Sequence, residues 1–448
     1  MSATIDIDNL RVGMFIHLDL GWWAHPFALS SFLLTSPEQI ATIRGLGLKR
    51  LRWSPEKSKL PEAAAFQTST LTPGTPSELQ EAVAAADAAA AAAAEAAAKT
   101  EAARRRAALA AQREADRICA EQYAEAGQAW KIASDQVQSL PQAARETGEA
   151  LTRALLDKMM IEGELCIRVL ADAGGDRNGA HALNVAVISL LMGRVFGFSE
   201  AEMMDLGLGA LMHDIGKLEI PERLRLPDGL FTAAENNQYR EHVAHGIAHG
   251  QRMGLSPGAM SVIAQHHEMA DGSGFPARLN GDRMNAPARI VALVNRYDNL
   301  CNPAVASHAL TPHEALSLIF AQAKSKFDAT MLNAFIRMMG VYPPGSMVQL
   351  TDDRYATVVS VNSSRPLKPR VLVCDAAVPV DEALLLNLEE VTDLGIRRSL
   401  KPSQLPVAVQ NYLAPRQRVV YFFEPALTGV VAAPAGPSGT TTREELAA

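Results

Sequence analysis

The 448-residue sequence has no long apolar run and contains few cysteines and aromatic residues. No stretch approaches the ~18 consecutive apolar residues that a membrane-spanning helix requires. The N-terminus has no basic region followed by an apolar run, so no secretory signal is predicted and we expect a cytoplasmic protein. The four cysteines are far apart (Cys119, Cys166, Cys301 and Cys374). This spacing argues against a paired zinc or thiol-redox motif.

An excess of positive charge is also missing. Lysine and arginine number 42 against 49 aspartates and glutamates, which gives a net charge of −7. Proteins that bind nucleic acid polymers usually carry a strongly basic face, so such a partner is not expected. A small anionic ligand remains compatible, because a local basic cluster does not depend on the total charge. At roughly 100–200 residues per domain, the length predicts two to four domains.

Composition divides the chain into five parts and predicts a mainly α protein. The first is a small α+β domain, interpreted as sensory or regulatory; a linker with an alanine-rich helical stalk follows, then a helical segment that holds nearly all the candidate chemistry. A small β-rich region and a disordered tail complete the chain. The predicted bounds are 1–60, 61–172, 173–340, 341–425 and 426–448. Three capping boxes in the helical segment begin with Ser199, Thr232 and Thr311.

The predicted stalk has an unusual composition, because 20 of the 30 residues from Ala82 to Ala111 are alanine. Alanine has the highest helix propensity, and the helical pattern continues with interruptions to about Asp172. One interpretation is a solvated helical spacer. The other is a coiled-coil stalk that forms a homodimer, although an alanine seam buries little surface. The sequence leaves both open.

Most of the 11 histidines lie between His181 and His267. His213-Asp214 ends an apolar segment, and burying this pair is costly unless a cation compensates it. Imidazole and carboxylate are good ligands of divalent metals, and a carboxylate can bridge two ions. His242, the pair His266-His267 and His181 belong to other predicted helices, so four helices present histidine to one interior, as in the dinuclear sites of helical bundles. We interpret His17, His25, His245, His249, His308 and His313 as ordinary residues.

Several motifs in this segment resemble those of the HD-GYP family, the HD-domain phosphohydrolases that cleave cyclic di-GMP. In chain order they are His213-Asp214-Ile215-Gly216-Lys217, Ile220-Pro221, His242-Val243-Ala244-His245-Gly246, His266-His267-Glu268, Asp271-Gly272-Ser273-Gly274-Phe275-Pro276 and Ala288-Arg289-Ile290-Val291. Leu10–Ser54 looks like the N-terminal domain that often precedes this module. The resemblance predicts an HD-type metal-site bundle over residues 173–340.

The resemblance implies a metal-dependent phosphodiesterase that hydrolyses cyclic di-GMP to pGpG, to GMP or to both in bacterial second-messenger signalling. It implies two divalent metal ions, with iron or manganese favoured over zinc. Asp214 would bridge the metals, and Lys217 would contact the scissile phosphate. Gly274, Phe275 and Pro276 would contribute to substrate binding, and their loop would also meet a signalling-protein partner. The implied metal ligands are His181, His213, Asp214, His242, His266 and His267.

Four positions depart from the family pattern, and the two in the late segment, Asn295 and Cys301–Ala304, support an alternative hypothesis. Phe275 replaces a tyrosine, Asn295 replaces a metal-binding aspartate, and Arg177 stands where members with three metals carry a glutamate. Cys301–Ala304 replaces a basic substrate-binding segment. Asp298, three residues after Asn295, is a candidate source of the missing charge. The alternative is a catalytically weakened module that binds a cyclic dinucleotide or takes part in signalling through protein interactions.

Overall fold

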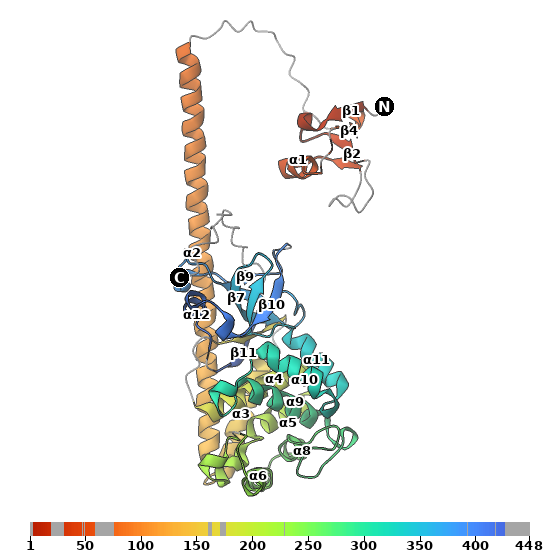
Figure 1. The fold of residues 1–448 in the computed structure, drawn as a ribbon, viewed down its shortest axis with the longest axis vertical. Coiled ribbons are helices and arrows are strands. Elements are labelled where there is room, and N and C mark those ends of the chain that lie inside the picture. Colours follow the sequence, from red (N-terminus) through yellow and green to blue (C-terminus); the bar gives the residue numbers. More distant parts are fainter. Residues whose placement is uncertain are drawn as a thin grey trace. The chain divides into compact units, whose positions relative to one another are not determined.

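The computed structural model is mainly α, with small sheets in the N-terminal and C-terminal parts, as predicted (Figure 1). It divides into two compact units, Met1–Ala96 and Ala97–Ala448. The described residues are 3–18, 31–46, 48, 50–58, 76–159, 164–170, 176–227, 229–391, 393–416 and 418–425. The predicted linker preceding residue 76 and the predicted tail after residue 425 lie outside them. No helix in the described part of the chain is both long and apolar enough to cross a membrane.

The N-terminal unit contains a four-stranded antiparallel sheet in the order β1-β4-β2-β3 and one short helix. The elements are β1 (Ala3–Asp6), β2 (Phe15–His17), β3 (Ser31–Leu33), α1 (Pro37–Arg44) and β4 (Arg50–Trp53). Ser36 caps the N-terminus of α1, because its side chain accepts a hydrogen bond from the backbone N–H of Gln39, and Gly45 is the C-cap. His17 bonds to Ser31 and Ser54 through its two ring nitrogens; His25 is not among the described residues.

The alanine-rich segment forms a single helix, α2 (Pro76–Gln136). Side chains from 87 to 100 are exposed. Further on, one stripe of the helix is buried in the core of the helical bundle, with members three and four positions apart: Cys119, Tyr123, Ala126, Trp130 and Ala133. This spacing is that of one helix face, so the C-terminal part of α2 packs as an amphipathic core helix.

The predicted helical pattern up to Asp172 is wrong in its last part. α3 (Pro141–Met159) is helical, but Leu165–Val169 forms strand β5. All five β5 residues are buried, and the strand pairs with both β11 (Tyr421–Pro425) and β7 (Tyr355–Asn362). A short, fully buried segment satisfies its backbone hydrogen bonds equally well in a helix or in a sheet, and sequence periodicity does not separate the two states.

Helices α4 to α11 form the bundle that holds the candidate site. They are α4 (Arg177–Val195), α5 (Glu200–Met212), α6 (Ala233–Arg240), α7 (His242–Met253), α8 (Pro257–Gln265), α9 (Ala286–Cys301), α10 (Pro312–Gln322) and α11 (Ala329–Met339). The capping boxes at Ser199, Thr232 and Thr311 are confirmed. The sequence pattern predicts that His181 opens its helix and that His242 lies inside the helix begun at Thr232, and both boundaries are wrong. α4 begins before His181, and His242 opens a separate helix after the Thr232 helix ends at Arg240.

The second sheet has the path β10-β6-β7-β5-β11, with β8 and β9 attached beyond β7. Its remaining strands are β6 (Met347–Leu350), β8 (Arg370–Val373), β9 (Leu386–Asn387) and β10 (Ile396–Leu400), and α12 (Val407–Leu413) precedes β11. A buried ion pair joins Arg168 of β5 to Glu424 of β11 at 2.8 Å, and Arg168 also contacts Asp116 of α2. The sheet therefore combines a strand that precedes the helical bundle in the chain with strands that follow it, and Arg168 connects the sheet to α2.

Candidate metal centre

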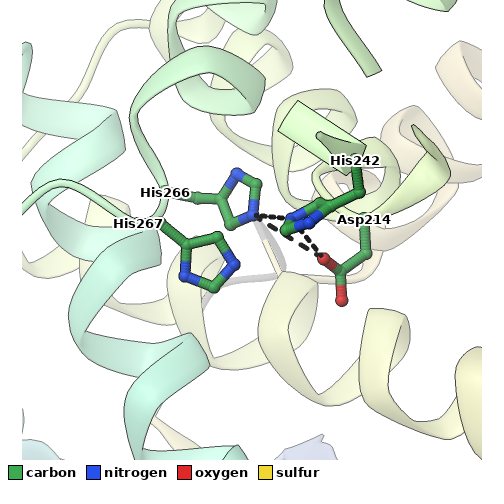
Figure 2. A group of neighbouring side chains, drawn as sticks. All are labelled: Asp214, His242, His266 and His267. Atoms are coloured by element: carbon green, nitrogen blue, oxygen red, sulfur yellow. Dashed lines mark hydrogen bonds and ion pairs between the residues drawn. The ribbon is translucent and has the colours of Figure 1, made fainter. Parts of the chain in front are cut away.

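Asp214 belongs to two groups of histidines, and Figure 2 shows the group that it forms with His242, His266 and His267. Its Oδ1 lies 3.5 Å from His242 Nε2 and 3.6 Å from His266 Nε2, and His267 belongs to the same group. Its Oδ2 lies 3.4 Å from the Nε2 atoms of both His181 and His213. One carboxylate therefore serves two sets of imidazoles, one with each oxygen.

Helix ends bring these residues together. His213 caps the C-terminus of α5, and Asp214 leads into a short 3-10 helix, η4 (Ile215–Glu219). Gly216 lets η4 touch α7, because a Cβ there would lie 1.9 Å from the carbonyl oxygen of His242. His266 caps the C-terminus of α8. The glycine of the His-Asp-Ile-Gly-Lys motif is thus required by a close backbone approach.

Hydrogen bonds to the backbone set the tautomers of three histidines. The Nδ1 atoms of His213, His242 and His266 each lie 2.6–2.8 Å from the carbonyl oxygen three residues earlier. A carbonyl only accepts, so each Nδ1 carries a proton, and the neutral rings of His213 and His242 present a bare lone pair at Nε2. His242 Nε2 and His266 Nε2 face each other at 3.2 Å. Two ring nitrogens at this distance need a proton or a metal cation to share.

His181 is held by a buried carboxylate. Its Nδ1 donates to Asp298 Oδ2 at 2.6 Å, while Asp298 Oδ1 accepts from Asn184 Nδ2 at 2.7 Å and Asn302 Nδ2 at 2.9 Å. A carboxylate behind an imidazole orients the ring and increases its basicity, as in metal sites. Burial favours a lower pKa for His181, but the hydrogen bonds and charges of Asp214 and Asp298 outweigh it and raise the pKa to about 9.

The rings of His213, His242 and His267 are neutral at physiological pH. Burial lowers the pKa of His213 to about 4 and that of His242 to about 3, and it holds the pKa of His267 well below the usual range. Burial would raise the pKa of Asp214, but Lys217 and His213 lower it well below its usual value. Neutral imidazoles and an ionised carboxylate are the protonation states that metal ligands need.

Two unpaired buried atoms test whether divalent metals fit here. Among the described residues, Asp214 Oδ1 and His267 Nε2 are buried without a hydrogen-bond partner. Buried polar atoms are almost always paired, so such orphans point to an ion or another group outside the protein chain. Both atoms belong to the group around Asp214 Oδ1, and imidazole and carboxylate suit iron, manganese or zinc. The donor set fits a metal pair.

Lys217 contacts the shared carboxylate directly. Its Nζ lies 2.5 Å from Asp214 Oδ2 and 5.5 Å from the centre of the Tyr239 ring. Burial favours a lower pKa, but the Asp214 charge outweighs it and raises the pKa of Lys217. Lys217 is therefore a fixed positive charge beside the group around Oδ2.

The Gly274-Phe275-Pro276 loop packs on the other group. Phe275 stacks on His267, with ring centres 4.4 Å apart and planes 19° apart. A Cβ at Gly274 would lie 2.4 Å from the Cα of Glu268, so only glycine lets the loop approach. The buried Glu268 carboxylate accepts hydrogen bonds from the backbone of Ala277 and Leu279, which secures the loop.

The structure places Asn295 and Asp298, the two residues considered for the position of the family's metal-binding aspartate, in different surroundings. Asn295 Oδ1 accepts a hydrogen bond from Asn299 Nδ2 at 2.6 Å. Asp298 lies behind His181 instead of joining either group around Asp214. Arg177 donates to the carbonyl oxygens of Asn302, Pro303 and Ala304, so it supports the segment that replaces the family's basic residues.

Two of the histidines that were not predicted to bind metal have partners outside the metal centre. His249 Nε2 contacts Glu219 at 2.8 Å, and His313 Nδ1 donates to the carbonyl oxygen of Val341.

A pocket opens beside the centre. His181, Asp214 and Lys217 line it, and their side chains are 15%, 18% and 13% exposed, whereas the His213, His242 and His266 side chains are fully buried. Further lining residues come from α2, from the turn after η5 (Glu222–Leu224), from the end of α9 and from the segment before β11: Trp130, Arg225, Asn299, Asn302 and Arg418. Parts of the chain far from the metal motifs therefore complete the site.

Two family comparisons agree with this architecture. Residues 164–331 match the HD domain family, and residues 2–154 match a domain of unknown function, DUF3391. The chain is an HD-domain protein with this N-terminal domain. The recognition of the HD-GYP family from the sequence is confirmed.

Among curated relatives, a cyclic di-GMP phosphodiesterase of Pseudomonas aeruginosa is 27% identical over 409 residues, which cover 88% of this chain and 89% of that protein. The cyclic di-GMP phosphodiesterase response regulator RpfG of Xanthomonas campestris is 33% identical over 33% of this chain and 39% of its own length. A solved HDGYP-type protein of Bdellovibrio bacteriovorus is 14% identical, with a TM-score of 0.39, over 75% of this chain and 98% of that one.

Proposed function

We propose that this chain is a dinuclear-metal phosphodiesterase that hydrolyses cyclic di-GMP to pGpG, to GMP or to both. One observation carries the proposal: the two oxygens of Asp214 each face a separate group of imidazoles. A protein has little other use for two such groups around one buried carboxylate. The substrate is proposed from the relatives, two of which are named for this activity.

In this proposal His242, His266 and His267 would hold one metal, His181 and His213 would hold the other, and Asp214 would serve both. Two bound divalent metals lower the pKa of a water from 15.7 toward ~7 and neutralise charge on the reacting oxygens of a diester. The ligand chemistry favours iron or manganese, with zinc as the alternative.

The chain's own groups position and stabilise the diester. Lys217 Nζ, held beside Asp214, supplies a compact positive charge for the phosphate oxygens as charge builds on them. Asp298 keeps His181 in the tautomer that presents Nε2 to the centre. Phe275, stacked on His267, offers an apolar wall beside the substrate without the hydroxyl of a tyrosine.

The test combines metal analysis with product detection. The full chain reconstituted with manganese, or with iron in the absence of oxygen, is expected to hold about two metals and to open cyclic di-GMP. Asp214→Asn keeps the side-chain shape but removes the shared charge, so metal and turnover should both be lost. Asp393→Asn at an exposed position is the matched control. A wild type that holds two metals but leaves the diester intact would contradict the proposal.

One observation favours a second candidate, a weakened module that binds the dinucleotide without appreciable turnover. Asn295 contributes no charge, and its amide oxygen already accepts a hydrogen bond from Asn299. The same reconstitution separates the candidates, because this one predicts binding of cyclic di-GMP without product.

Two interactions accompany the proposal. The Gly274-Phe275-Pro276 loop is a proposed contact for a signalling-protein partner. The exposed part of α2 over residues 87–100 is the proposed contact of a homodimer. Light scattering of the full chain tests the dimer.

A further inference from the structure

The pocket beside the metal centre contains a guanidinium without a partner. Arg418 lines the pocket, and its side chain makes no hydrogen bond or ion pair with any other residue that the structure describes. Two neighbouring cations are already engaged. Arg177 donates to three carbonyl oxygens near Asn302, and Arg225 donates to the carbonyl oxygens of Ile220 and Leu218.

The backbone beside Arg418 is attached to the metal centre. Val419 N donates to Asn302 Oδ1 at 2.9 Å, and its carbonyl oxygen accepts from both Asn302 Nδ2 and Asn184 Nδ2 at 2.9 Å. These two asparagines also donate to Asp298, which holds His181. The backbone next to Arg418 is therefore tied to the metal ligands through the amides of Asn184 and Asn302, although Arg418, an exposed residue, lies outside the HD-domain match.

The charges near Arg418 favour an anion. Burial and the nearby Arg418 charge both lower the pKa of Arg177, so two guanidinium groups repel each other here. A phosphate between them would relieve this repulsion, and arginine suits phosphate because its planar donors match two oxygens.

The substrate of the proposed function carries two phosphodiester groups, of which one is cleaved at a time. The second needs a partner, and Cys301–Ala304 supplies no basic side chain for it. Asn302 of that segment instead holds the backbone next to Arg418. We propose that Arg418 binds the phosphate that is not being cleaved, and that this chain has moved this contact from the end of α9 to the segment before β11. This inference rests on the proposed function for the identity of the ligand.

The test uses the metal-loaded full chain with Arg418→Gln and Arg418→Lys. Arg337→Gln, exposed on α11 away from the pocket, is the matched control. The binding probe is a phosphorothioate analogue of cyclic di-GMP that resists hydrolysis. We expect Arg418→Gln to weaken its binding about tenfold, the low end for a hydrogen bond to a charged group. Lysine should restore part of the loss.

A kinetic comparison separates this contact from the chemical step. In Arg418→Gln, kcat/KM for cyclic di-GMP should fall about tenfold more than kcat/KM for bis(p-nitrophenyl) phosphate, because the latter substrate has a single phosphate. If the wild type hydrolyses cyclic di-GMP and Arg418→Gln binds the analogue within twofold of wild type, the inference fails and the proposed function stands. If the wild type binds without hydrolysis and Arg418→Gln binds more weakly, the inference stands and the hydrolytic proposal fails. A wild type that neither binds nor hydrolyses overturns both.

Discussion

Asp298→Asn is the most informative single change, because Asp298 touches the centre only through His181. His181 Nδ1 donates to Asp298 Oδ2, while the other oxygen already accepts from two amides. An asparagine that keeps its oxygen toward these amides turns its NH₂ group toward His181 Nδ1. Two donors then meet, so the ring takes the other tautomer and presents Nε2–H to the metal.

The expected magnitude follows from the role of such partners. Losing the carboxylate behind a metal-binding imidazole typically costs 10–100-fold in metal affinity, or about 1.4–2.7 kcal/mol. We expect this loss at one of the two metals only, because the group around Asp214 Oδ1 does not involve His181. Asp393→Asn is the control for the loss of an exposed carboxylate.

The pH dependence makes the prediction sharper. The pKa of His181 is raised to about 9 in the metal-free protein, so a metal competes with a proton there below that pH. Apparent affinity at this site should rise about tenfold per pH unit between pH 7 and 9. In Asp298→Asn the pKa falls and this slope flattens, so the deficit of the variant is greatest near pH 9.

The free energy of unfolding of the metal-free wild type should fall as pH rises, whereas its metal affinity should increase. A raised histidine pKa contributes stability below its unfolded value near 6.5, and this is lost as pH rises through 9. Calorimetric titration of the chelator-stripped protein with Mn²⁺ at pH 7, 8 and 9 measures the affinities, and thermal unfolding measures the stability. An Asp298→Asn protein with wild-type affinity at pH 9 and an unchanged slope would refute the reasoning.

Three further changes test the remaining roles. Replacing His213 and Asp214 together by alanine should abolish metal binding and lower the stability of the bundle, and stoichiometric metal in that variant would show that the site is misassigned. Lys217→Ala should leave metal content intact and reduce kcat about 10²–10³-fold, the usual cost of losing one stabilising group for developing charge; loss of metal would instead make Lys217 structural. Asn295→Asp should tighten the second metal and raise the rate, since Asn299 can donate to a carboxylate equally well. A harmful effect of the last change would show that the centre has adapted to an amide.

The residues found from the sequence are those whose neighbours in the chain reveal them. His213-Asp214 and His266-His267 are adjacent pairs at the ends of apolar segments, a pattern that has few explanations besides a metal. The capping boxes at Ser199, Thr232 and Thr311 are equally local, because each is a bond between a residue and the third one after it. Each of these features can be recognised from residues that lie no more than a few positions apart in the chain.

The residues that the sequence did not reveal depend on distant partners. The sequence indicates Asp298 only as a substitute for the charge missing at Asn295, because nothing nearby in the chain shows that it holds His181, 117 positions away. The sequence pattern predicts helix at β5, because its partner strands lie far along the chain. No sequence pattern indicates Arg418, since it is a single arginine in an irregular segment. A scan for buried asparagines could have found the link, because Asn184 and Asn302 join these parts.

The metal centre therefore extends beyond the segment that carries its motifs. Trp130 of α2 donates its indole N–H to the carbonyl oxygen of Leu211, two residues before His213, and its ring lies against Gly179, two residues before His181. Val419 bonds to the asparagines that hold Asp298. α2 therefore contacts the end of α5 beside His213 and the start of α4 beside His181, and the segment before β11 contacts α4 through Asn184. These are the two helices that carry the histidines of the Asp214 Oδ2 group.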